Sequence, residues 1–341
     1  MFLKELSEAS GISSREQEIR DLIREYVKPN VDEVFTDSLG NLYAVKGKDK
    51  VGPKVMLAAH MDEVGLMITN IEKNGLLRFS PVGGVDPRVL VSKPVAIGKN
   101  KVIGVIGAKA IHLQRPEERS QVLGYDDLYI DIGASDDEEA KKLVKTGDVV
   151  VFATKFQELG DLLLGKAFDD RAGCTALIEL TKCEFACPVY FVFTVQEEVG
   201  LRGAGPASYR VAPDVALVLE GTTASDVGET DEANYSTTLG EGPAVTIMDR
   251  SVISHPGVVS MLFKLARENG IPLQMKRTIT GGTDAGKISL SRGGVPTAVM
   301  AVPCRYIHSP VTVMNYNDLQ HMVKLAEIFV QEIAQKGVEL S

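Results

Sequence analysis

Five short segments each place a histidine or a carboxylate at or just after an apolar run typical of a buried strand. They are AAHMDEVG around His60, KAFDDRAG around Asp169, TVQEEVGLRGA around Glu197, LVLEGT around Glu220 and RYIHSP around His308. Imidazole nitrogens and carboxylate oxygens are ligands that divalent transition metals prefer. Two histidines and several acids on separate strand ends favour a two-metal hydrolytic site over one structural zinc.

Each segment has a less specific explanation when it is taken alone. A histidine at a strand end is more often a hydrogen-bonded structural residue, although Asp62, two positions after His60, could orient a metal-binding imidazole. Asp169 and the next aspartate begin a predicted helix, so one could cap the helix while the other points at a metal. Glu197 and Glu198 should point to opposite sides of a continuing strand and so serve two partners.

Composition excludes several classes of protein. The chain has 341 residues, a net charge of -9 and a pI near 5.2, which argues against a nucleic-acid partner. It has no apolar run long enough to span a bilayer and no secretory leader that we can recognise, so we expect no membrane partner. The four cysteines form no C-x-x-C pair, which favours reduced thiols and a cytoplasmic location.

The segments need a scaffold that brings strand ends together. Apolar runs predict strands over 55–59, 189–195, 215–219 and 298–302, and helical spacing predicts helices over 171–182, 256–268 and 317–336. A capping box of Ser13 and Glu16 predicts a further helix after it. From about Val64 to Leu159, short β-like runs separated by turns indicate a β-rich insertion. We therefore expect an α/β catalytic domain of 1–67 and 160–341, interrupted by an inserted domain of 68–159.

The ordered set of segments, together with GGTDAG at 281–286, resembles the di-metal aminopeptidases of the glutamyl-aminopeptidase and tetrahedral-aminopeptidase family. The resemblance covers nearly the whole chain, including GVIGAKAIHLQRPEER and DDLYIDIGA in the insertion. It implies an α/β mixed-sheet catalytic domain of the di-zinc peptidase type with an inserted small β-barrel, PDZ-like domain. We assign no role to GGTDAG, in which Thr283 or Asp284 could cap a helix.

The resemblance also implies a role for each candidate residue. Asp169 would bridge two divalent metal ions, of which zinc is favoured while cobalt and manganese remain open. Glu197 would be the general base, and Asp62 would support the first histidine. The family usually has Asp at position 220, so the geometry of one metal is in question here. The terminal ligands would be His60 and Glu220 on one ion, and Glu198 and His308 on the other.

The activity implied is hydrolysis of the N-terminal residue of short peptides by a metal-bridged hydroxide. Similar proteins assemble through the inserted domain into tetrahedral dodecamers, so we expect a homo-oligomer. Two alternatives are an endoglucanase-type glycosidase, which would leave both histidines without a task, and a non-catalytic assembly protein of the same fold. No substrate-binding residue and no preferred N-terminal residue are identified, although Arg250 could favour acidic side chains.

Overall fold

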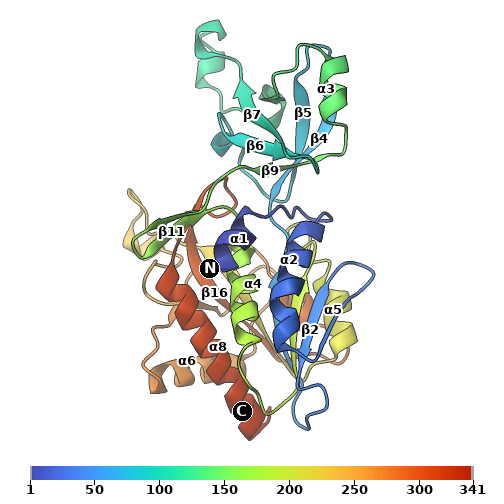
Figure 1. Cartoon of the computed structure of the whole chain (residues 1–341). Coiled ribbons are helices and arrows are strands. Elements are labelled where there is room, and N and C mark those ends of the chain that lie inside the picture. Colours follow the sequence, from blue (N-terminus) through green and yellow to red (C-terminus); the bar gives the residue numbers. More distant parts are fainter. Residues whose placement is uncertain (1, 339–341) are drawn as a thin grey trace.

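The computed structural model describes residues 2–338, which form an α/β part and a closed β-barrel stacked beyond one end of it (Figure 1). The helices are α1 (Phe2–Glu8), α2 (Gln17–Val27), α3 (Asp137–Leu143), α4 (Phe168–Leu180), α5 (Ala204–Val211), α6 (Pro256–Glu268), α7 (Ala285–Ile288) and α8 (Tyr316–Lys336). We find no helix among residues 2–338 whose length and hydropathy would let it cross a membrane.

The α/β part is built on one mixed sheet of eleven strands. Its central strands β12, β3, β13 and β16 are mutually parallel, and antiparallel strands flank them on both sides. The carboxyl ends of the four parallel strands therefore meet at one edge of the sheet. The strands are β1 (Glu33–Thr36), β2 (Leu42–Lys46), β3 (Val55–His60), β10 (Gln157–Leu159), β11 (Leu162–Gly165), β12 (Val189–Thr194), β13 (Val215–Thr223), β14 (Ala244–Thr246), β15 (Gln274–Lys276), β16 (Thr297–Arg305) and β17 (Thr312–Asn315).

Helices cover both faces of this sheet, and the alternation of strand residues explains why. In β3, Leu57 and Ala59 pack in the core beneath α1, α2, α4 and α8, while Met56 and Ala58 pack in the core beneath α5 and α7. Successive strand residues point to opposite faces, so a strand covered on both faces is apolar throughout. This is the reason why the central strands appear in the sequence as continuous apolar runs.

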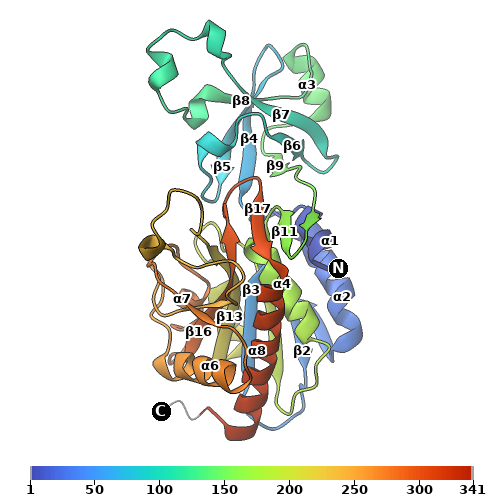
Figure 2. The ribbon, with the colours of Figure 1, turned by 90° about the vertical axis from the view of Figure 1, so that its left-hand side faces the viewer.

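The barrel closes in the order β4-β5-β8-β7-β6-β9 and has a core of its own. The β-rich insertion predicted from the sequence is thus present, and Figure 2 shows it beyond the sheet. The division at 68 and 159 stays a prediction; the barrel strands begin at Gly65, and β10 pairs with β11 in the large sheet. The strands are β4 (Gly65–Ile71), β5 (Leu77–Val82), β6 (Pro94–Ile97), β7 (Val102–Ala108), β8 (Leu128–Asp131) and β9 (Val149–Phe152).

The predicted capping box before α2 is wrong. The helix begins at Gln17 without a side-chain cap, and Ser13 instead donates its hydroxyl to Asp62 Oδ2 at 2.6 Å. Glu16 accepts the backbone N–H of Gln196 at 3.2 Å. Both side chains are used for contacts distant in sequence, and such contacts override a local capping pattern.

Candidate metal centre

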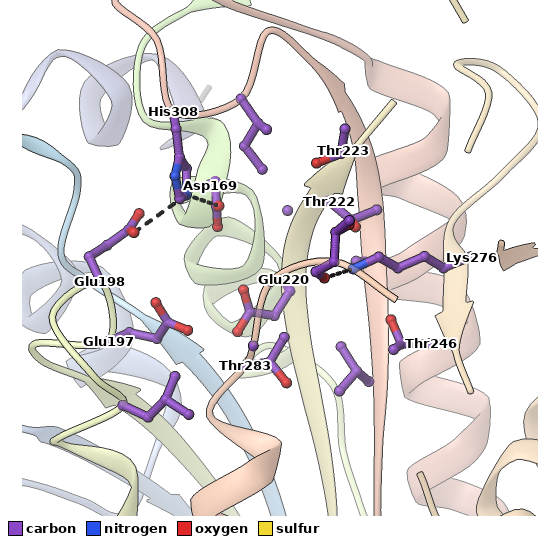
Figure 3. Close-up of a pocket in the computed structure, with 18 residues that line it drawn as sticks. Asp169, Glu197, Glu198, Glu220, Thr222, Thr223, Thr246, Lys276, Thr283 and His308 are labelled. Atoms are coloured by element: carbon purple, nitrogen blue, oxygen red, sulfur yellow. Dashed lines mark hydrogen bonds and ion pairs between the residues drawn. The ribbon is translucent and has the colours of Figure 1, made fainter. Parts of the chain in front are cut away.

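The five segments predicted to hold metal meet at the carboxyl edge of the parallel strands. His60 is the last residue of β3, Glu220 lies within β13, and Asp169 lies in the first turn of α4. Glu198 follows β12, and His308 follows β16. The chain thus delivers one ligand candidate from each of five neighbouring elements, as parallel topology requires. Four of them, together with Glu197, line a cavity of about 490 Å³ (Figure 3), and the fifth, His60, lies next to the lining residue Asp169.

The distances divide these side chains into two groups that share one carboxylate. Asp169 directs Oδ1 to His60 Nε2 at 3.1 Å and Oδ2 to His308 Nε2 at 3.4 Å. Glu220 Oε2 lies 3.6 Å from the same nitrogen of His60, and Glu198 Oε2 lies 3.4 Å from that of His308. Each imidazole therefore faces one oxygen of Asp169 and one further carboxylate.

The donor set fits divalent cations. Oε1 of Glu198 and Oε1 of Glu220 are buried without a hydrogen-bond partner, an unfavourable arrangement for a carboxylate unless a cation binds it. Ligand atoms of His60, Asp169 and Glu198 lie within 4.8 Å of one another, as do those of His60, Asp170 and Glu220. The available atoms are imidazole nitrogens and carboxylate oxygens, which suit zinc, cobalt and manganese.

Burial and charge perturb this cluster strongly. Burial raises the pKa of Glu198 to about 7 and that of Glu220 well above its usual value, because neither carboxylate is well solvated. Burial opposes protonation of His308, but the hydrogen bond to Asp169 and the charge of Glu198 raise its pKa to about 9. The site thus concentrates more negative charge than its two imidazoles can neutralise, which also favours cation binding.

Asp62 connects the first histidine to the turn that carries the acids. The Nδ1 atom of His60 lies 3.0 Å from the carbonyl oxygen of Asp62 and 3.5 Å from its Oδ1. The carboxylate of Asp62 also accepts the backbone N–H groups of Glu197 at 2.9 Å and Glu198 at 3.1 Å. The predicted support of His60 is thus accompanied by a second contact, to the acids themselves, which sequence reasoning missed.

Asp169 and Asp170 have different surroundings. The sequence analysis allowed for this, with one residue capping the helix and the other pointing at a metal. Asp170 accepts the backbone N–H of Gly173 at 2.8 Å and that of His60 at 3.1 Å. Both aspartates have non-helical backbone angles, so the regular helix begins after them. Asp170 is also a possible ligand beyond those that the sequence analysis named, since its ligand atom lies within 4.8 Å of those of His60 and Glu220.

The reason given for separating Glu197 from Glu198 is wrong, although the separation exists. Strand β12 ends at Thr194, and both acids lie in the turn that follows. Glu197 Oε2 lies 4.0 Å from His60 Nε2, whereas Glu198 approaches His308. The turn geometry, including a positive φ of 57° at Gln196, directs the two side chains to different imidazoles.

The cavity wall contains polar residues that sequence reasoning missed, among them Thr222, Thr246 and Lys276. Lys276 and Thr246 come from three-residue strands, β15 and β14, which are too short to show a periodic pattern. Arg250 is exposed and does not line the cavity.

The GGTDAG segment lines the cavity with Gly281, Gly282 and Thr283. The helix cap considered for it is wrong. Thr283 donates to Asp249 at 3.2 Å, and Asp284, at the N-cap of α7, makes no capping hydrogen bond and instead accepts the Thr194 hydroxyl at 2.5 Å.

Comparison with known proteins gives a consistent result. A lysyl aminopeptidase of Pyrococcus furiosus is 36% identical over 97% of this chain and 96% of its own. The crystal structure of a TET aminopeptidase from a marine sediment thaumarchaeon superposes with a TM-score of 0.95 at 36% identity, covering 99% and 97% of the two chains. The TET1 peptidase of Pyrococcus horikoshii, which can assemble into a tetrahedron or a large octahedral shell, gives 0.85 at 36% identity over 97% and 98%.

One similar structure carries a different name. A Thermotoga maritima protein called an endoglucanase is 39% identical, covers 98% of each chain and has a TM-score of 0.82. It shares the aminopeptidase fold, so its name does not support the glycosidase alternative, which we set aside. The family model for M42 glutamyl aminopeptidases matches residues 40–325. The chain belongs to the M42 glutamyl aminopeptidase family, and it is a metal-dependent aminopeptidase.

Proposed function

We propose that this metallo-aminopeptidase binds two divalent ions in the cavity and uses Glu197 as its general base. His60 and Glu220 would hold one ion, Glu198 and His308 the other, and Asp169 would bridge them. The observation that supports this arrangement is the placement of Asp169, whose two carboxylate oxygens face the two imidazoles, one each.

The bound ions would polarise the scissile carbonyl and lower the pKa of a water molecule between them. The chain's own residues supply the rest. Glu197, only 8% exposed in the cavity wall, accepts the proton of the attacking water and returns it to the leaving amine. Asp62 holds the backbone of Glu197 and Glu198 so that both carboxylates keep their directions. The surplus of carboxylates attracts the α-ammonium group, which distinguishes an N-terminus from an internal peptide bond.

Zinc is the ion we favour, with cobalt and manganese as alternatives, because nitrogen and oxygen donors suit all three. Glu220 stands where the family usually has Asp and makes a direct test possible. Glu220→Asp should keep both ions with altered affinity for one, because it retains a carboxylate. Glu220→Ala should weaken the binding of one ion selectively. Metal stoichiometry by mass spectrometry measures both variants, and unchanged stoichiometry and activity in the Ala variant would remove Glu220 from the site.

Lys276 supports a preference for acidic N-terminal residues. Its side chain enters the cavity from the side opposite to Glu198 and His308 (Figure 3). The ammonium group donates to the Thr280 carbonyl at 2.9 Å, and within residues 2–338 no carboxylate lies within 4.0 Å of it. A glutamate or aspartate side chain would pair with this partly buried charge, whereas an apolar side chain would leave it unpaired.

We further propose that the barrel makes contacts between subunits of a homo-oligomer, a tetrahedral dodecamer as the resemblance implies, in the cytoplasm. Large apolar side chains lie exposed on the barrel, including Ile103, Ile111 and Val122, which are 63%, 68% and 72% exposed. Large apolar side chains that lie exposed on one part of a protein are candidates for contacts with other chains. The assembly of the Pyrococcus horikoshii relative also supports an oligomer.

The test of the function is hydrolysis of aminoacyl p-nitroanilides by metal-stripped protein reloaded with zinc, cobalt or manganese. Activity that a chelator abolishes and an added ion restores supports the proposal, and a higher kcat/KM for glutamyl than for leucyl or lysyl substrates supports the acidic preference. Hydrolysis that survives complete metal removal would contradict the mechanism.

A further inference from the structure

A second cavity of about 630 Å³ adjoins the metal centre on the other side of His308. Ile307 and His308 line both cavities, so these two residues form the boundary between them. The far wall of the second cavity comes from the barrel and includes Arg88 and Lys93. It therefore lies at the junction of the two parts of the molecule, directly next to the residues proposed to hold metal.

The barrel closely approaches the metal centre at this junction. A Cβ atom at Gly83, whose φ is +79°, would lie 3.3 Å from Cβ of Glu198, and one at Gly84 would lie 3.5 Å from Nδ1 of His308. The loop between β5 and the 3-10 turn Pro87–Val89 thus packs with bare backbone against two proposed ligands. The barrel is consequently part of the site wall as well as a separate folding unit.

The second cavity carries one unbalanced positive charge. Asp86 is neutralised by Arg88, whose Nε donates to Oδ2 at 2.8 Å. Lys93 is partly buried, and across residues 2–338 no carboxylate lies within 4.0 Å of its ammonium group. The rest of the wall is largely apolar and includes Val91 and Pro310. An apolar wall with a single cation suits a short peptide segment that ends in a carboxylate.

We propose that this cavity is the subsite for the part of the peptide that follows the scissile bond, and that Lys93 binds the free C-terminal carboxylate of di- and tripeptides. The inference rests on the proposed function: if the N-terminal residue occupies the first cavity, the second cavity, which shares Ile307 and His308 with it, is the adjacent space for the remaining peptide. Lys93 would then select for di- and tripeptides, because their C-terminal carboxylate follows the scissile bond by only one or two residues. An acidic side chain of a longer peptide offers the same chemistry and is the competing source of the carboxylate.

The experiment compares kcat/KM for a tripeptide with a free C-terminus and for the same tripeptide as its C-terminal amide. The parent enzyme should prefer the free acid by about threefold to fivefold, the size expected for a partly exposed charge pair. Lys93→Met should bring the ratio near one, Lys93→Glu should invert it, and Lys93→Arg should restore it. The matched control is Lys99→Met, on an exposed lysine of the same barrel that does not line the cavity.

Three outcomes would overturn the proposal. The ratio in Lys93→Met could equal that of the parent, or it could fall equally in Lys99→Met. Alternatively, Lys93→Met could change only the preference of amidated peptides for Glu over Gln after the scissile bond, which would assign the subsite to acidic side chains. A parent enzyme that hydrolyses no glutamyl, leucyl or lysyl p-nitroanilide with any of the three ions would instead refute the proposed function, and the subsite with it. The p-nitroanilides carry no peptide beyond the scissile bond, so the two failures are distinguishable.

Discussion

The α/β part and the barrel differ in whether they bury polar side chains. Within residues 2–338, every buried polar or charged side chain belongs to the α/β part, and the barrel strands and their connections contribute none. The barrel core consists of side chains such as Leu66 and Ile130. Burying charge without a partner costs stability, so the carboxylates gathered around the cavity, two of them with an unpartnered oxygen, indicate where function rather than folding selects the residues. The barrel has an apolar core of its own, whereas the candidate ligands lie in the α/β part.

Among the variants that would test this difference between the two parts, we expect the largest change in activity at Glu197. Glu197→Gln keeps the size of the side chain but removes the proton acceptor, so kcat should fall by about 10²–10⁴-fold while two metal ions remain bound. Glu198→Gln should also weaken one ion, because an amide is a poorer ligand. Metal stoichiometry and peptide hydrolysis distinguish the two variants. Near-normal hydrolysis by Glu197→Gln would refute the mechanism.

A second buried charge cluster in the α/β part should affect stability instead. The Glu63 carboxylate pairs with Lys166 at 2.6 Å and Arg171 at 3.2 Å, and all three side chains are at most 2% exposed. Glu63→Gln leaves two buried cations without their anion and should lower the free energy of unfolding by about 3–5 kcal/mol. Denaturant titration measures this. The control is Glu138→Gln, on the barrel surface, which should leave the midpoint of denaturant unfolding unchanged. If Glu63→Gln also left that midpoint unchanged, the cluster would not be stabilising.

The barrel should respond to loss of apolar volume without affecting chemistry. Leu66 is fully buried in the barrel core, so Leu66→Ala should cost about 2–5 kcal/mol of stability through lost burial and a residual cavity. Metal stoichiometry of the folded protein should remain that of the parent. Loss of metal in a variant that is still folded would show that the two parts are less independent than their cores suggest.

The smallest expected effect concerns substrate choice. Lys276→Met should reduce the preference for glutamyl over glutaminyl p-nitroanilide by about tenfold, the size of one hydrogen bond to a charged group. The exposed Lys264 supplies the control, since Lys264→Met should keep the preference of the parent. An unchanged ratio in the Lys276 variant would place acidic recognition elsewhere.

The side chains that the sequence analysis selected lie close together in the structure because most of them stand near or just after the end of a strand that is apolar on both faces; Asp169, at the start of α4, is the exception. Once β3, β12, β13 and β16 are parallel, the segments after them must converge. The helix Pro256–Glu268 was also predicted with its observed bounds, since Pro and Gly mark its two ends.

Contacts between segments that are distant in the sequence cannot be predicted from it when neither segment carries a local pattern. The Ser13 hydroxyl donates to Asp62, 49 positions away, although its local sequence predicts a helix cap. Lys276 reaches the cavity from a three-residue strand, and Gly84 approaches His308 through tertiary packing alone. No periodicity or turn chemistry could have predicted these neighbours, because each depends on how complete elements pack.

The pairing of β4 with β9 has a consequence for how the chain folds. The contact between His60 and Asp169 closes a loop of 109 positions, most of which the barrel occupies. The barrel's first and last strands are neighbours, with Leu66 opposite Val150. If the barrel forms first, the flexible chain left to close shortens to about 25 residues, which lowers the entropic cost of closure by about 1 kcal/mol. The insertion therefore separates two proposed ligands in sequence while keeping the chain segments that carry them close in space.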